Sequence, residues 1–429
     1  MNCAHRSMVF ASLAIGLMLG SLTAVAQIDQ GAITGIVHDP TGAVIPNAKI
    51  TLTDTDTNLV LQGTSDSGGN YVFSPLKIGN YKVSATAAGF DTSTQENLHV
   101  DAQSRLNIAI VLKVGSTTQE VIVTTAQPLI ESEQSSVGQT LSTQTINDTP
   151  LNGRNWVYIA QLTAGVVPST GLSRGASSGD FFANGQRATQ NDFVLDGVDN
   201  NINDIDFMNG ASYAVRPPPD ALSEFKVDTS NFSAEFGHSA GAVLNASIKS
   251  GTNAIHGSMW EYVRNTLFDA KDWEALTIPK YIENQFGATL GFPLLRNHLF
   301  YFGDVEANRI VFGATTTQSV PTALMRQGNF SELLNTSLTG QAQPIQLYQP
   351  NSGGTVTLQC NGQNNVFCPS QIDPVAQAIL NLYPAPTPGI PQTTNNSIVT
   401  LSNSNNTWQW DQRLDWNISA KDQTFARYS

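Results

Sequence analysis

An eleven-residue stretch near the C-terminal end, WQWDQRLDWNI at residues 408–418, constrains the fold more than any other feature of the sequence. Its side chains alternate between two faces: Trp408, Trp410, Gln412, Leu414, Trp416 and Ile418 share one, and Gln409, Asp411, Arg413, Asp415 and Asn417 share the other. Alternation of this kind indicates a β-strand, here about twice the average length in soluble proteins. An aromatic face backed by a charged face is typical of a strand that crosses a bilayer around a polar interior.

Two other stretches predict strands of the same kind. QFGATLGF (285–292) sets Phe286, Ala288, Leu290 and Phe292 against Gln285, Gly287, Thr289 and Gly291. LFYFGDVEANR (299–309) sets Leu299, Tyr301, Val305 and Ala307 against Asp304, Glu306 and Asn308. We therefore predict that residues 251–429 form the N-terminal part of a transmembrane β-barrel, with outer-membrane lipid on one face and a polar lumen on the other.

A long segment, about residues 320–406, separates these predicted strands. It contains the stretch DPVAQAILNLY, which predicts a helix, and both Cys360 and Cys368. Outer-membrane barrels carry their long loops outside the cell, so we expect an extracellular loop. In an oxidising compartment the two cysteines could close a disulfide, with free thiols as the alternative.

Residues 1–26 resemble a secretory signal peptide in their layout. His5 and Arg6 form a basic start, an apolar run follows, and the small residues 24–26 give an A-x-A cleavage site. No later stretch offers about 18 consecutive apolar residues, so a mature chain that crosses a membrane would do so as a barrel.

The charge balance argues against a nucleic-acid partner. The formal net charge is −13, and only 13% of residues are charged. No cluster of Lys and Arg interrupts the acidic character, so the cationic surface needed to neutralise phosphates is missing.

Residues 27–114 carry short β segments separated by polar turns, which predict a small β-sandwich. GIVHDPTGAVIPNAKITLTD and TSDSGGNYVFSPLKIGNYKVSATAAGF resemble the carboxypeptidase regulatory-like domain, a transthyretin-like sandwich. The resemblance depends on Asp66, Gly69, Tyr71, Gly79, Tyr81, Gly89 and Phe90. Another immunoglobulin-like module is the alternative.

Residues 115–127 contain the β-branched stretch QEVIVTTAQ ahead of a polar linker. An exposed strand can add to the sheet edge of a partner through main-chain hydrogen bonds. The stretch resembles the TonB box of outer-membrane receptors, which would consist here of Glu120, Val121, Ile122, Val123, Thr124, Thr125 and Ala126. The alternative is that it is simply the first strand of the following domain.

Residues 128–250 mix helix and strand patterns, with short helices expected near residue 143 and from about Asn155. The stretches TPLNGRN, NGQRATQNDFVLDGVDNN and SAEFGHSAGAVLNASIKSGTNAIHGSMWEYVRN resemble the plug domain of Oar-like TonB-dependent outer-membrane receptors, as does VPTALMRQGNF. The residues carried over as plug structure are Pro150, Leu151, Asn152, Gly153, Arg154, Asn155, Asp196, Gly197, Asp199 and Asn200. The resemblance implies a protein of the cell outer membrane that pairs with periplasmic TonB and takes up a bulky ligand, with oligosaccharides and siderophores among the candidates.

The predicted fold class is therefore mainly β: a transthyretin-like β-sandwich, an α/β plug domain and the first strands of an incomplete transmembrane β-barrel. A transporter of about 22 strands needs roughly 220 spanning residues, so we expect the chain to be a fragment. The alternative function is a surface or periplasmic carbohydrate-binding or adhesive module without transport activity.

The polar loop around Gly197 raises the question of a metal or catalytic site. Asp199, Asn201 and Asn203 have calcium-loop spacing, but Asp204 and Gly210 occupy the positions where an EF-hand needs Gly and Glu. Asp196 and Asp199 have no His or Lys nearby in sequence. The loop is better interpreted as a turn whose Asx side chains bond their own backbone and whose Gly197 has an unusual φ.

The sequence offers no other catalytic arrangement. Ser177 fits G-x-S-x-G but lacks the strand and helix that a nucleophile elbow requires. His38, His99, His238, His256 and His298 show no ligand spacing. We therefore predict no enzyme activity, no cofactor and no metal site.

Overall fold

The computed structural model describes residues 30–115, 120–124, 135–168, 180–202, 213–237, 239–271, 273, 278–350 and 352–429. The expected signal peptide, the last two residues of the box-like segment, and Ser177 lie outside these residues. The chain divides into two compact units: unit 1 comprises Met1–Trp260, Gly287–Glu306 and Trp408–Ser429, and unit 2 comprises Glu261–Phe286 and Ala307–Thr407. The fold is mainly β, as predicted.

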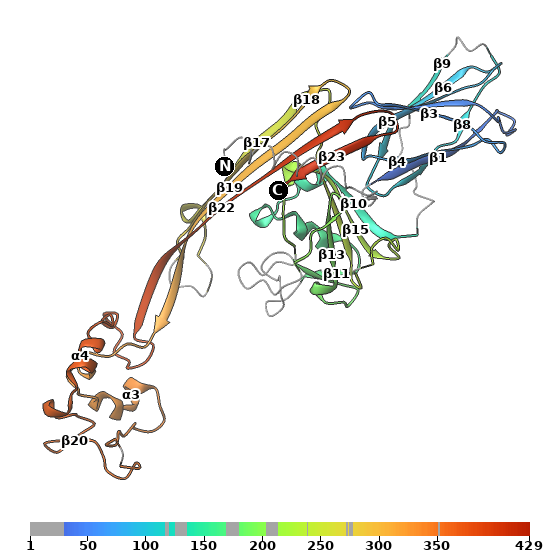
Figure 1. Ribbon diagram of the computed structural model, residues 1–429. Helices are drawn as coiled ribbons and strands as arrows, with labels where there is room; N and C mark the ends of the chain where they lie inside the picture. The colour runs from blue at the N-terminus through green and yellow to red at the C-terminus, as the bar shows by residue number, and fades with distance from the viewer. Residues whose placement is uncertain are drawn as a thin grey trace, which may run out of the picture. The chain divides into compact units, whose positions relative to one another are not determined.

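Residues 30–115 and 120–124 form two sheets that enclose one apolar core (Figure 1). One sheet contains β1 (Gly31–His38), β4 (Asn70–Leu76), β7 (Arg105–Asn107) and β8 (Ile110–Val111). The other has the order β3-β2-β5-β6-β9 and contains β2 (Lys49–Asp54), β3 (Val60–Thr64), β5 (Gly79–Thr86), β6 (Thr92–Val100) and β9 (Glu120–Thr124). We call this region the N-terminal sandwich.

The turns of the N-terminal sandwich follow from aspartates that bond the backbone beyond them. Asp39 Oδ1 accepts hydrogen bonds from the backbone N–H groups of Thr41 (2.8 Å) and Ala43 (3.0 Å). Asp66 Oδ1 accepts in the same way from Gly68 and Asn70, both at 2.8 Å. In such Asx turns the aspartate side chain bonds the backbone of the turn. This explains why the strands end where polar clusters occur in the sequence.

The box-like segment forms part of this sandwich. Strand β9 pairs in parallel with β6, from the Thr92–Glu120 pair to the Glu96–Thr124 pair. It is the outermost strand in the order of its sheet. The segment therefore continues the sandwich sheet, and it is not the first strand of the following domain.

Residues 135–250 form a second module around a sheet of order β10-β15-β16-β13-β14. Its strands are β10 (Val137–Ser142), β13 (Asp192–Leu195), β14 (Val198–Asp199), β15 (Leu222–Ser230) and β16 (Val243–Ile248). Strands β13 and β16 pair in parallel, whereas β15 is antiparallel to both β10 and β16. The core of this second module includes Trp156 and Phe225, whose ring centroids lie 5.2 Å apart.

The two short helices predicted here form, with one difference in type. Helix α2 (Thr143–Asp148) begins after Ser142, whose side chain accepts from the Thr145 N–H. The second helix, η2 (Trp156–Leu162), is a 3-10 helix with Asn155 as its N-cap. A 3-10 helix has three residues per turn, so its turns are tighter than those of an α-helix. The buried residues of η2, which pack into the core, are Trp156, Val157, Ile159 and Ala160.

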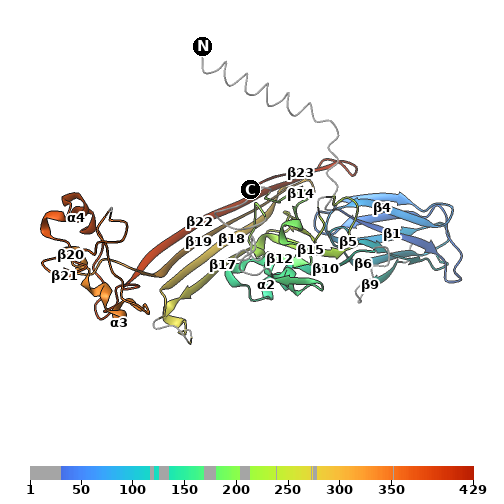
Figure 2. The ribbon, with the colours of Figure 1, turned by 90° about the horizontal axis from the view of Figure 1, so that it is seen from below.

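The third sheet contains the long amphiphilic strands, in the order β17-β18-β19-β22-β23 (Figure 2). They are β17 (His256–Asn265), β18 (Tyr281–Leu295), β19 (Leu299–Gln318), β22 (Ser397–Asn417) and β23 (Gln423–Tyr428). On β22 the side chains of Asp411, Arg413 and Asp415 are buried, whereas Leu414 and Trp416 are 41% and 50% exposed. The charged face therefore points inward and the aromatic face outward, as the alternation predicts.

Strand β22 begins at Ser397, so the predicted loop boundary near residue 406 was wrong. The stretch SNSNN is polar on both faces and carries no alternation, which is why the sequence pattern missed this part of the strand.

The segment between β19 and β22 lies in unit 2 and carries little regular structure. A disulfide joins Cys360 and Cys368. The predicted helix forms as α4 (Pro374–Leu380), capped by the Asp373 carboxylate on the Val375 N–H at 2.7 Å. Among the described residues, no helix combines the length and apolar character required to span a bilayer.

The second-module core gives a first prediction. Phe225 is fully buried against Trp156, so Phe225→Ala should lower the free energy of unfolding by about 3–5 kcal/mol. Urea unfolding followed by tryptophan fluorescence measures this change. Leu162→Ala is the control, because Leu162 is 69% exposed and should change stability little. Equal effects of the two substitutions would contradict the core assignment.

Candidate functional site

The polar loop around Gly197 is a tight hairpin turn between β13 and β14, in which Leu195 pairs with Val198. Asp196 and Gly197 occupy the turn with φ values of 49° and 77°. A two-residue turn with positive φ at both positions favours an Asp-Gly pair, because its twist matches that of the flanking strands. The sequence thus places Asp196 in the turn, at the end of strands β13 and β14.

The neighbouring Asx side chains bond the backbone and one another. Asp199 Oδ1 accepts from the Asn201 N–H at 2.8 Å. The Asn200 side chain makes two hydrogen bonds with the backbone of Val215, at 2.8 and 2.9 Å. Asn201 Nδ2 donates to Asp192 Oδ1 at 2.6 Å. These bonds shape the turn, as expected; Asn203 and Asp204 lie outside the described residues.

Asp196 behaves differently from its neighbours. Its carboxylate is almost fully buried, and Oδ1 accepts from the Ile248 N–H and from Arg413 Nη1, both at 2.9 Å. Its other oxygen, Oδ2, lies 2.9 Å from Arg427 Nε. The turn of the second module is therefore tied to strands β22 and β23 by two ion pairs.

Arg413 joins Asp196 to a second carboxylate. Its Nε and Nη2 donate to Oδ2 and Oδ1 of Asp415 at 2.9 and 3.2 Å, a bidentate arrangement. Its Nη1 also donates to the Ile248 carbonyl at 2.9 Å, and its guanidinium carbon lies 4.7 Å from the centre of the Phe425 ring. A planar fork of donors stacked on an aromatic ring is the geometry in which arginine binds most specifically.

Asp415 extends the network to the N-terminal sandwich. Lys77 Nζ donates to its Oδ1 at 3.0 Å, and Ser250 Oγ donates to its Oδ2 at 2.9 Å. We call these five charged residues the ion-pair network, made up of Lys77, Asp196, Arg413, Asp415 and Arg427. Its three cations and two carboxylates join the sandwich, the second module and strands β22 and β23 of the third sheet. All five residues belong to unit 1.

Burial and charge act in opposite directions on the Asp196 carboxyl. Burial raises its pKa, and the guanidinium groups of Arg413 and Arg427 act against this rise. An ionised carboxylate at such a position depends on its cationic partners, because an unpaired buried charge is costly.

The expected plug motif at residues 150–155 makes a second contact with the third sheet, at strand β17. Gly153 and Arg154 have φ values of 60° and 50°, which turn the chain sharply. The Arg154 guanidinium pairs with Asp220 and lies over the Trp260 ring of β17, 5.5 Å from the ring centre. Asn155 Nδ2 donates to the Tyr213 hydroxyl at 3.1 Å. Of the remaining motif residues, Leu151 packs against the second-module core.

Sequence reasoning missed the partners of Asp196. It assigned Arg413 and Asp415 to the polar face of a strand, but 217 residues separate Arg413 from Asp196. The available signal was that Asp411, Arg413 and Asp415 share the face of the strand opposite to the predicted lipid face. Buried charges require partners of opposite sign, so partners for these residues could have been expected.

Comparison with known protein families adds independent information. Residues 32–113 match the carboxypeptidase regulatory-like domain, and residues 247–429 match the outer membrane beta barrel domain. The match to the barrel domain confirms the predicted outer-membrane location.

A sequence relative confirms the resemblance to Oar-like TonB-dependent receptors. The chain is 25% identical over 312 residues to the TonB-dependent transporter Oar of Myxococcus xanthus. The aligned region covers 68% of this chain and 27% of that protein. The chain thus spans about a quarter of the length of this relative.

Solved structures of outer-membrane proteins are similar over part of the chain. The outer membrane transporter YddB from Escherichia coli is 12% identical, with a TM-score of 0.38 over 66% of this chain and 31% of that one. The siderophore receptor PirA from Acinetobacter baumannii is 18% identical, with a TM-score of 0.33 over 43% of this chain and 29% of that one.

The ion-pair network gives a second prediction. Asp196→Asn keeps the size of the side chain but leaves Arg413 and Arg427 without this counter-charge, so the free energy of unfolding should fall by about 3 kcal/mol or more. Urea unfolding of the detergent-solubilised protein measures it. Asp199→Asn, in the same turn but exposed, should change stability by less than about 0.5 kcal/mol. A matching loss in both variants would contradict a specific role for Asp196.

Proposed function

We propose that the protein acts as a TonB-dependent outer-membrane transporter in which the second module is the plug of the barrel. The observation that carries the proposal is the ion-pair network, because it attaches the Asp196 turn to inward-facing charges of β22 and β23. An inward face lined with charge needs either water or a polar partner, and a plug supplies that partner.

The chemistry of this attachment suits a plug that has to move. A buried ion pair gains little net energy over hydration of the separated charges, because the desolvation penalty offsets much of the Coulomb attraction. The network therefore fixes one geometry while water is excluded. When water enters the interface, the charges are rehydrated and separation of the plug costs less than the loss of an equally large apolar contact.

Coupling to TonB would use the box-like segment. Strand β9 is bonded to β6 along one edge, and no strand in the described part of the chain pairs with its other edge. An open strand edge is the feature that β-strand addition requires. We propose that TonB pairs with β9, and that the resulting pull moves the plug and admits a bulky ligand. Oligosaccharides and siderophores are both candidate ligands.

A substitution in β9 tests the TonB contact. Ile122→Pro removes a backbone N–H and fixes φ, so it should abolish co-purification with the periplasmic domain of TonB. Ile122→Val keeps the strand and should retain binding. Undiminished binding of Ile122→Pro would exclude β9 as the contact.

The outward face of β22 gives a matching prediction for the barrel. Leu414→Arg places a charge on the lipid-facing side, at a cost of about 2–4 kcal/mol near the middle of the bilayer. We expect less protein in the outer-membrane fraction and loss of heat-modifiable migration on gels, whereas Leu414→Met should behave as the natural chain does. If the natural chain partitions with soluble periplasmic proteins, the proposed function is wrong.

A further inference from the structure

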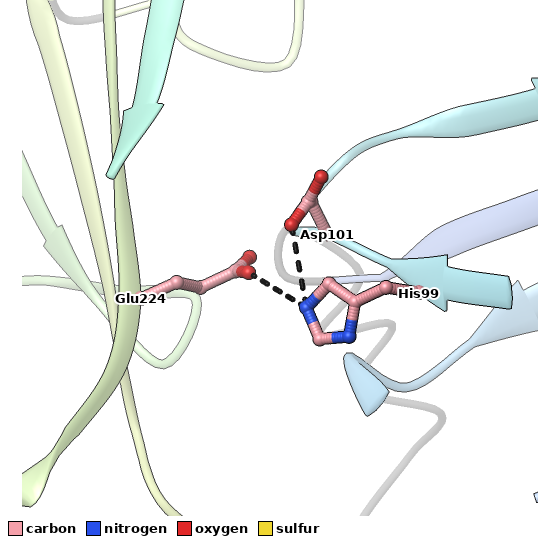
Figure 3. Close-up of side chains that lie close together, drawn as sticks. All are labelled: His99, Asp101 and Glu224. Atoms are coloured by element: carbon pink, nitrogen blue, oxygen red, sulfur yellow. Dashed lines mark ion pairs between the residues drawn. The ribbon is translucent and has the colours of Figure 1, made fainter. Parts of the chain in front are cut away.

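Three side chains with metal-ligand chemistry meet where the N-terminal sandwich contacts the second module (Figure 3). His99 lies on β6, Asp101 follows directly after that strand, and Glu224 lies on β15. His99 Nε2 lies 3.4 Å from Asp101 Oδ1 and 3.7 Å from Glu224 Oε2. The sequence did not indicate this group, because Glu224 is far from the other two along the chain and one histidine has no ligand spacing of its own.

The histidine ring is held in one orientation. His99 Nδ1 lies 2.9 Å from Asn80 Oδ1, and Asn80 Nδ2 donates to Asp56 Oδ2 at 3.1 Å. Because the amide nitrogen of Asn80 is used on Asp56, its oxygen faces the ring and accepts the Nδ1 proton. Nε2 then faces the two carboxylates, which is favourable when it carries a proton or binds a metal ion that the carboxylates share. A metal-bound imidazole usually donates its second ring N–H to an acceptor such as a carboxylate, a backbone carbonyl or water, and the Asn80 side-chain oxygen can accept it here.

We propose that His99, Asp101 and Glu224 form a binding site for a divalent transition metal of the Zn²⁺ type, which joins the N-terminal sandwich to the second module. The spacing supports this assignment. Zn–N and Zn–O bonds of about 2.1 Å in a tetrahedron place neighbouring ligand atoms about 3.4 Å apart. The two distances from Nε2 are 3.4 and 3.7 Å, and all the ligand atoms lie within 4.8 Å of one another.

Glu224 is the most buried of the three side chains. Its side chain is 2% exposed. Its carboxylate accepts the Ala102 N–H and lies beside His99 and Asp101. A buried carboxylate close to a second carboxylate is stabilised by a metal ion far more than by solvent.

An ion can reach the site from solvent. The His99 side chain is about half exposed and lines a cavity of about 470 Å³, to which Asp56 and Asn80 also contribute. Three protein ligands with water in the fourth position are a common Zn²⁺ arrangement. Two ligands come from the sandwich and one from the second module, so metal binding requires the two to be in contact.

Titration of the untagged, chelator-treated full chain with ZnCl₂ tests the proposal. Calorimetry at pH 7.5 should detect a site that His99→Ala removes. Asn80→Ala keeps all three ligands and should weaken binding about 10–100-fold, because only the support of the ring is lost. His38→Ala, on strand β1 of the opposite sandwich sheet, should bind as the natural chain does.

The pH dependence provides a second readout. Metal ions compete with protons for imidazole and carboxylate ligands, so the apparent affinity should fall as the pH drops from 8 to about 6. Absence of Zn²⁺ binding, or equal binding by His99→Ala, would overturn the proposal and leave a protonated imidazole bridging two carboxylates. Neither result bears on transport, so this test is independent of the proposed function.

Discussion

The arrangement of unit 1 depends on the neutralisation of Arg413. This residue brings a full positive charge to a position that is 9% exposed, on a strand whose opposite face carries tryptophan and leucine. A charge there is tolerated only with close partners, and Asp196 and Asp415 supply them at 2.9 Å. Because Asp196 belongs to the second module, the requirement for neutralisation determines which turn of that module meets the strand.

The same requirement connects the other modules. Asp415 is shared between Arg413 and Lys77, so the sandwich contributes a cation to the same network. At a separate point the sandwich places His99 and Asp101 against Glu224 of the second module. Polar contacts of this kind are specific in geometry but modest in net energy, and they respond to water, protons and metal ions. Such contacts can be broken without unfolding either module, which the proposed transport mechanism requires.

Much of this fold could be predicted from local patterns. The alternation at residues 408–418 gives both the strand and its two faces, and the Asp-Gly pair at residues 196–197 gives the turn, because each depends on neighbouring residues. The Asx turns of the sandwich follow for the same reason. The start of β22 at Ser397 could not be predicted, since its first half has polar residues on both faces.

The functional contacts could not be predicted from sequence, because they are long-range. Asp196 and Arg413 are 217 positions apart, and the strand partner of the box-like segment is set by the sandwich sheet. The interpretation of Asp196 as a residue that bonds its own turn was wrong, since its carboxylate instead accepts the Ile248 N–H and forms ion pairs with two guanidinium groups. Burial of charge is a property of the folded state, and it shows in sequence only as an unexplained polar residue.

Hydrogen exchange at the Ile248 amide tests the central claim most directly. This N–H donates to Asp196 Oδ1 inside the ion-pair network, so it should exchange slowly in the natural protein and much faster in Arg413→Ala. Rapid exchange in the natural protein, or equally slow exchange in the variant, would show that the second module is not held against β22 by these charges.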